Sequence, residues 1–157
     1  MGQAVQGGAG FPATDAALLL RFFRDFVVAV HLQKEATWLW PSIVMRSEGI
    51  TASAAGEVAL LHEEATELIH CLVLFWEPGE LSEVEREGFA ATTRALHDRL
   101  VRMMRLEEQT LFPACKHSVP ADDLLEWADE FARIESARGG AAVWLVALRD
   151  VLAQWTG

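Results

Sequence analysis

The sequence predicts an all-α fold, an antiparallel helical bundle, and two observations support this prediction. Apolar residues recur at intervals of three and four along four long stretches, which is the period of one buried helix face. Glycine and proline separate these stretches by short connections, as in antiparallel bundles. No stretch has convincing strand character, and the 52% hydrophobic content of the 157 residues is enough for one continuous core.

We expect residues 1–14 to be a flexible lead-in and residues 15–157 to form a single bundle domain. The opening segment, MGQAVQGGAG, has neither the basic cluster nor the long apolar run of a secretory signal. Nowhere do about 18 apolar residues follow one another, so we expect no membrane span. A protein without these two features is expected to be cytoplasmic.

The first two helices are expected over residues 15–46 and about 52–76. Thr14 or Asp15 is the expected N-cap of the first helix, because short polar side chains accept hydrogen bonds from the first free backbone N–H groups. A Pro78-Gly79 pair should stop the second helix.

A third helix should start after Leu81 and end near Ser118, and a fourth helical stretch should cover residues 121–155. The fourth stretch contains Gly139 and Gly140. Adjacent glycines weaken a helix interior, so we expect this stretch to be kinked or divided in two.

The charge and the cysteine content make nucleic-acid binding and a structural disulfide unexpected. Thirteen Lys and Arg residues stand against 23 Asp and Glu, a net charge of -10, so binding to the phosphates of nucleic acid is not expected. Cys71 and Cys115 both lie in helical apolar stretches and are expected to be buried free thiols without a disulfide.

An internal repeat is the most informative feature of the sequence. HLQKEATWLWP, residues 31–41, aligns with MMRLEEQTLFP, residues 103–113, which lies 72 residues later. Glu35 aligns with Glu107, whereas His31 aligns with Met103. Both copies end in a Leu-aromatic-Pro triplet, and this agreement in register is unlikely to arise by chance.

Residues of the repeat predict a metal site. His31 and Glu35 are one helical turn apart, so their side chains can converge on one point. Glu107 repeats the carboxylate on another helix, and His62 lies on the intervening helix among leucines. Three helices thus offer nitrogen and oxygen ligands to one place, although a His and a Glu at this spacing also occur as an ordinary surface pair.

The same residues resemble the hemerythrin-like cation-binding bundles. FFRDFVVAVHLQKEATWLWP, LLHEEATELI and LVRMMRLEEQTLFPA are similar to three successive helices of that family, and the tail that begins EFARIESARGG is similar to an extra C-terminal helix. The resemblance implies non-haem iron as the cofactor, as one ion or a di-iron pair, with glutamates bridging and histidines terminal. Carried over by position, the metal ligands are His31, Glu35, His62 and Glu107.

This chain departs from the family pattern at two ligand positions. Met103 stands where the family's second copy has histidine, and we expect its thioether to fill the core, because sulfur is a poor ligand for iron. The family's first helix, with its own histidine, has no counterpart here. Hemerythrins proper also place a histidine where this chain has Thr66.

Three functions remain open at the level of sequence. The resemblance implies a carrier or sensor of oxygen or another small oxidant. Open coordination positions also suit an oxygen-activating di-iron enzyme. The missing ligands leave a third alternative, a metal-free bundle with a structural, interaction or other catalytic role.

Two kinds of partner are expected. One is a small diatomic or other small molecule. The other is a second copy of the chain in a homodimer, because the last helix is apolar over most of its circumference.

Overall fold

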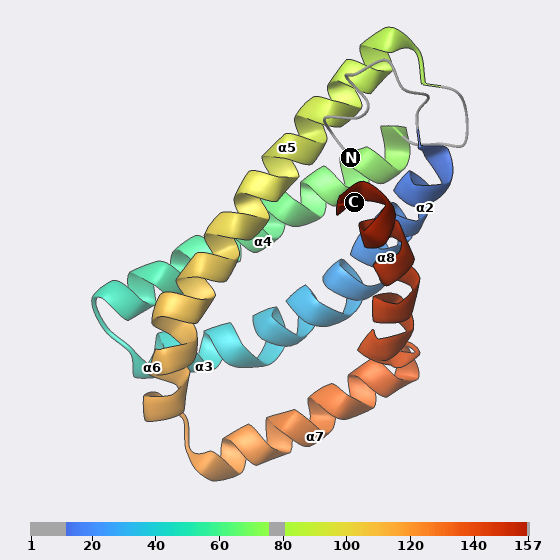
Figure 1. The fold of residues 1–157 in the computed structure, drawn as a ribbon. Coiled ribbons are helices and arrows are strands. Elements are labelled where there is room, and N and C mark those ends of the chain that lie inside the picture. Colours follow the sequence, from blue (N-terminus) through green and yellow to red (C-terminus); the bar gives the residue numbers. More distant parts are fainter. Residues whose placement is uncertain (1–11, 76–80, 157) are drawn as a thin grey trace.

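The computed structural model describes residues 12–75 and 81–156, and across these two ranges the chain is helical and contains no strand (Figure 1). The predicted all-α fold is confirmed. The expected Pro78-Gly79 helix stop and most of the expected lead-in lie outside the described residues. No described helix is both long enough and apolar enough to cross a membrane.

The first helix runs without interruption from Ala13 to Arg46 and changes its winding along the way. Two of its parts are π-helical, which is a wider winding in which hydrogen bonds join residues five apart. Its parts are α2 (Ala13–Phe22), η1 (Phe23–Leu32), η2 (Glu35–Leu39) and α3 (Trp40–Arg46), with η1 and η2 the π-helical ones.

The start of this helix differs from the prediction. Pro12 is the residue that precedes the helix, and the N–H of Ala16 bonds to its carbonyl at 2.9 Å. Thr14 and Asp15 therefore lie inside the first turn, and the prediction that one of them is the N-cap was wrong. Proline favours this start because its fixed φ is compatible with entry into a helix.

The second and third long helices lie side by side in antiparallel directions (Figure 1). The second is α4 (Ile50–Phe75), and the third comprises α5 (Glu83–Leu106), η3 (Glu107–Leu111) and α6 (Phe112–Ser118). Ser82 and Glu85 form a capping box that starts α5. Ion pairs from Glu57 to Arg102 and from Glu64 to Arg99 join α4 to α5 along their length.

The last helical stretch is divided, as predicted. It forms α7 (Ala121–Ala137) and α8 (Gly140–Thr156), and the break falls at Gly139 and Gly140, whose φ angles are +85° and +74°. Glycine adopts this left-handed region without the steric cost that other residues incur. The chain can therefore change direction sharply between the two helices, which meet at an angle (Figure 1).

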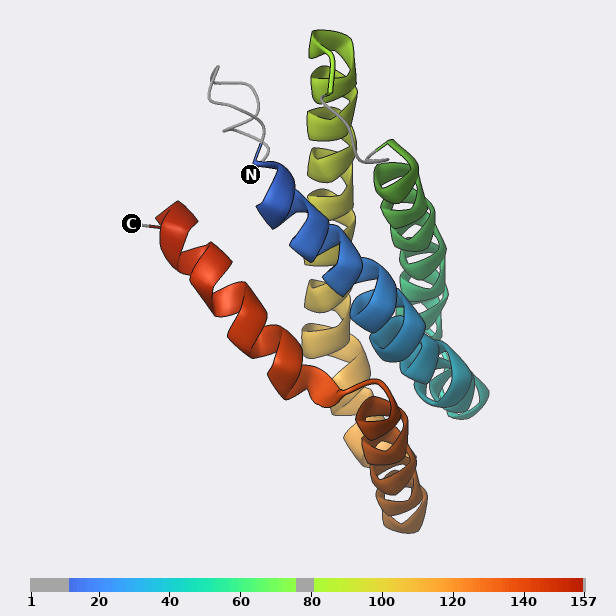
Figure 2. The same cartoon turned by 90° about the vertical axis from the view of Figure 1, so that its right-hand side faces the viewer.

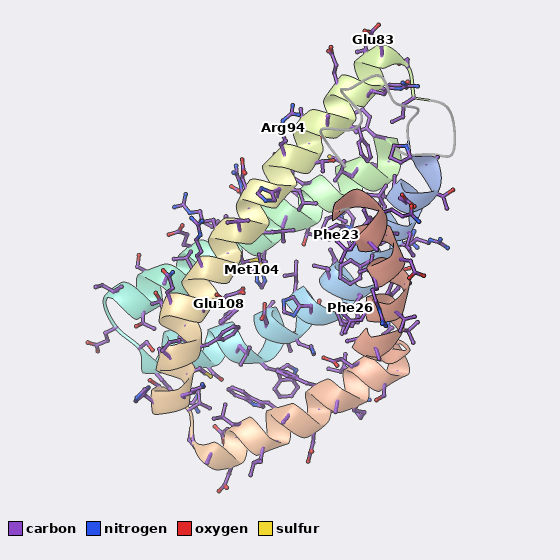
Figure 3. All side chains as sticks on the ribbon, in the orientation of Figure 1. Phe23, Phe26, Glu83, Arg94, Met104 and Glu108 are labelled. Atoms are coloured by element: carbon purple, nitrogen blue, oxygen red, sulfur yellow. The ribbon has the colours of Figure 1, made fainter. Side chains whose placement is uncertain are left out.

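Helix α8 covers one side of the first helix. The two run alongside each other in Figure 2, and the rings of Phe22 and Trp144 pack with centroids 5.8 Å apart. Figure 3 shows Phe23 and Phe26 in this same region. The buried side of α8 includes Leu148 and Val151. The C-terminal helix thus buries part of the apolar surface of the first helix within one chain.

The core consists of two apolar clusters that follow one another along the bundle. One includes Leu61 of α4 and Met103 of α5, and the other includes Ala65 and Ile69 of α4. His62 therefore lies on α4 at the junction between the two clusters. The burial of Met103 in the first cluster confirms its predicted core role.

Candidate metal centre

Both glutamates of the repeat begin a π-helical segment. The N–H of Trp40 bonds to the carbonyl of Glu35, and the N–H of Phe112 bonds to that of Glu107. A proline follows each aromatic residue and has no N–H to continue an α-helical pattern, so the widened turn suits both positions. Segments of π-helix are frequent at functional sites. The sequence repeat therefore corresponds to a repeated backbone feature that positions a carboxylate.

The two carboxylates approach one imidazole in the interior. The Nε2 atom of His62 lies 3.4 Å from Oε2 of Glu35 and 3.6 Å from Oε1 of Glu107. All three side chains are buried, and one donor atom from each lies within 4.8 Å of the other two. Three helices distant in sequence thus bring a Glu-His-Glu group together, and this group could hold a metal ion.

Several polar atoms of this group form no hydrogen bond within the part of the chain that the structure describes. Among the described residues, the buried side-chain atoms without a hydrogen bond are Oε2 of Glu35, Nε1 of Trp40, both ring nitrogens of His62 and Oε1 of Glu107. Leaving such a group unsatisfied costs about 1–3 kcal/mol, and more when the group is charged. A cation held by the two carboxylates and the imidazole would satisfy three of the five atoms at once. The donor set therefore fits a metal.

The carboxylates also control the protonation of His62. Burial alone would lower the pKa of this imidazole, but the neighbouring carboxylates of Glu107 and Glu35 outweigh burial and raise the pKa above its ordinary value. The separations are long for good hydrogen bonds, so much of the attraction is electrostatic. Without a metal, a proton on His62 is the positive charge that the two carboxylates favour.

The fourth predicted ligand, His31, lies at the edge of the group. Its Nε2 atom is 3.8 Å from Oε1 of Glu35, and its side chain is 44% exposed. Glu35 thus faces His62 with one oxygen and His31 with the other. The structure brings Glu35, His62 and Glu107 together in the interior and places His31 at the solvent side of Glu35.

The remaining histidines and the cysteines do not join this centre. His97 pairs with Asp98 at 3.2 Å on the surface, and His117 lies 2.6 Å from the Pro113 carbonyl. Cys71 and Cys115 are both free, as expected, but Cys71 is exposed. The prediction of two buried thiols was wrong at Cys71, because this residue falls on the outer side of α4.

Sequence analysis missed two residues beside the centre. Trp40 is buried with its ring centroid 6.0 Å from that of His62, in an edge-to-face arrangement, and it stacks on Phe112 at 6.3 Å. Lys34 is buried next to Glu35 and pairs with Glu135 of α7. The repeat did contain a signal for Trp40, since tryptophan replaces the phenylalanine of the second copy.

An open groove on the surface between η1 and α4 reaches the side chain of His62. It has a volume of about 400 Å³ and is lined by apolar residues of the first helix, including Val28 and Leu32. His62 lines it on α4, together with Glu63 and Glu67. A small molecule in this groove would lie beside the imidazole.

Comparison with known proteins agrees with this geometry. Residues 3–115 match the family model described as the hemerythrin HHE cation-binding domain. This match includes His31, Glu35, His62 and Glu107 and ends within α6. No curated protein matches the sequence, and no solved structure matches it.

Proposed function

Because the chain belongs to the hemerythrin HHE cation-binding domain family, we propose that Glu35, His62 and Glu107 bind non-haem iron, with His31 as an outer ligand. We propose further that the protein carries or senses oxygen or another small oxidant at this iron. One observation carries the proposal: three buried ligand atoms from three helices converge, and none of them has a hydrogen bond among the described residues.

The chemistry of the donors supports iron. Carboxylate oxygen and imidazole nitrogen suit iron in either common oxidation state, and no thiolate lies in the described group to favour softer metals. The first ion would occupy the interior position between Glu35, His62 and Glu107. A second ion would have to use the other oxygen of Glu35 and the half-exposed His31, so we expect weaker binding there.

The structural features around the centre then have defined roles in this function. Iron with few protein ligands supplies open positions to a small molecule. The π-helical segments η2 and η3 orient the carboxylates, and the apolar clusters on either side of His62 limit the entry of water. The groove beside His62 gives a path for a small ligand.

The groove also favours a second candidate function, an oxygen-activating enzyme. Its volume of about 400 Å³ is larger than a diatomic molecule needs. Pockets of a few hundred Å³ are the usual size for organic ligands. An organic substrate in this groove would lie beside His62, one of the proposed metal ligands.

The test is iron content and optical spectroscopy of protein loaded with ferrous iron and then exposed to air. Glu107→Gln keeps the size of the side chain but removes its charge, so we expect it to lose most of the bound iron. Glu108→Gln is the matched control, because this neighbouring carboxylate is exposed. Equal iron in Glu107→Gln and the parent would contradict the proposal, and a parent that holds no iron would indicate a metal-free role.

The same preparation separates the two candidate functions. A spectrum that appears in air and is reversed by removing oxygen or adding a reductant supports carriage or sensing. Consumption of oxygen with oxidation of an added organic compound supports the enzyme.

A further inference from the structure

Trp40 has a buried hydrogen-bond donor beside the candidate metal centre. Its indole Nε1 atom has no partner among the described residues, and its ring lies against the imidazole of His62. Buried tryptophans usually find an acceptor for this N–H group. The four other unpartnered buried atoms of the described residues belong to Glu35, His62 and Glu107, and the Trp40 ring packs against the imidazole of that group.

A metal ion accounts for the two carboxylate oxygens and the Nε2 atom of His62, but not for the Nδ1 atom of His62 or the indole of Trp40. Carboxylate oxygens and the Nε2 atom of an imidazole offer lone pairs to a cation. The indole N–H can only donate, so a cation gives it no partner. Its partner must be an atom that carries a lone pair, and when a cation occupies the two carboxylates a bound molecule can supply that atom.

The second copy of the repeat has an aromatic residue without a nitrogen at the position equivalent to Trp40. Phe112 occupies the position equivalent to Trp40 and stacks on it, with 25° between the ring planes. The two equivalent rings are therefore in contact, and only the ring of the first copy carries an N–H group.

We infer that Trp40 determines ligand specificity by donating its indole N–H to a small anion that binds in the centre together with the cation. This inference rests on the proposed function. Two carboxylates already balance the charge of a divalent cation. An added anion in this buried place therefore benefits from a neutral donor that offsets its desolvation. A ligand without a lone pair in reach of the indole gains nothing from Trp40.

The experiment uses the full-length chain, with zinc as a diamagnetic probe metal and formate as the probe anion. In nitrogen-labelled protein, the Trp40 indole N–H resonance should change little when zinc alone is added. It should move downfield and exchange more slowly with water when formate follows. Trp40→Phe identifies this resonance by its loss.

Calorimetry with the same probes gives the second measurement. Trp40→Phe should weaken formate binding to the zinc-loaded protein by about tenfold, the effect of one hydrogen bond to a charged ligand. Zinc affinity should stay within about twofold, since the ring does not bind the cation. Trp127→Phe is the control, because it removes another buried tryptophan, on α7, and should change neither affinity.

Three results would overturn the inference. A Trp40 resonance that shifts fully with zinc alone would mean that the indole donates to a carboxylate. A resonance protected from exchange in metal-free protein and insensitive to both probes would mean that it donates to a trapped water molecule. Equal formate affinity in Trp40→Phe and the parent would exclude a role in anion binding. Loss of zinc binding in every variant and the parent would instead contradict the proposed function.

Discussion

Lys34 of the first helix, which is buried, forms an ion pair with the partly exposed Glu135 of α7. Its ammonium group also lies 5.0 Å from the centre of the Phe131 ring, so one cation contacts two residues of α7. Lys34 directly precedes Glu35, the first carboxylate of the candidate metal centre. The ion pair therefore fixes α7 against the segment that positions this carboxylate.

We predict that Glu135→Gln destabilises the fold by about 1–3 kcal/mol, since it leaves the buried charge of Lys34 without its partner. Glu135 is 34% exposed, so the loss should be smaller than for a fully buried pair. Thermal unfolding with and without the substitution measures the effect. Glu130→Gln is the control on the same helix, because its pair with Arg133 lies on the surface. Equal melting temperatures for the parent and Glu135→Gln would contradict this prediction.

The raised pKa of His62 predicts that metal binding depends on pH. A cation at Nε2 must replace the proton that Glu35 and Glu107 favour there, so binding should release a proton. Affinity should rise as the pH increases and level off above the folded-state pKa of His62. Titration calorimetry between about pH 6 and about pH 9, in buffers with different ionisation enthalpies, measures both quantities, because the ordinary pKa of histidine lies near the start of this range.

The same shift predicts the opposite trend for the stability of the metal-free protein. The folded-state pKa of His62 is raised, so its contribution to stability is fully present below the unfolded-state pKa and is lost as the pH rises through the folded-state value. In His62→Gln, this decrease in the free energy of unfolding with rising pH should disappear. An unfolding free energy with the same pH dependence in His62→Gln and the parent would assign the trend to other groups.

The outer side of α8 predicts self-association. Val143, Leu145 and Val146 are exposed there, although other residues of the helix pack on α2. Exposed apolar patches of this kind are typical of interfaces, and a symmetric dimer is the simplest way to cover one. We expect a dimer by light scattering at micromolar concentration and a monomer for Leu145→Glu. Val84→Glu, at an exposed apolar position of α5, should remain dimeric. A monomeric parent would contradict the prediction.

The helices were predictable from sequence because they depend on local periodicity and on glycine and proline. Division of the last stretch at Gly139 and Gly140 follows directly from the two glycines. Convergence of Glu35 and Glu107 was expected because a repeated motif on two helices of one bundle tends to meet across the core. These features need no knowledge of how distant side chains pack.

Other features depend on packing that the sequence does not reveal. The π-helical winding at Glu35 was not foreseen, since periodicity in short segments distinguishes poorly between helix types. Burial of Lys34 depends on the approach of Glu135 from α7, far away in sequence. The exposure of His31 depends on which helices cover that side of the first helix.

The substitution Met103→His would make the second copy of the repeat match the first. Met103 is buried one turn before Glu107, and its carbonyl accepts the backbone N–H of Glu107. A histidine there could add a nitrogen ligand to the centre, so we predict that affinity for ferrous iron rises by about ten- to a hundred-fold. In a carrier or sensor the oxygen response should persist, whereas an enzyme should turn over more slowly because fewer coordination positions remain open.

Without metal, Met103→His should lower the free energy of unfolding by about 1–3 kcal/mol, because an imidazole replaces a packed thioether in the core. Ferrous iron should offset this loss, since a ligand that binds only the folded state stabilises it. Melting temperatures with and without ferrous iron, for the parent and the variant, measure this linkage. Met104→His is the matched control, because the adjacent side chain is 48% exposed and should add no ligand. If Met103→His is destabilised equally with and without iron, then position 103 does not face a metal, and the centre inferred from the repeat is wrong.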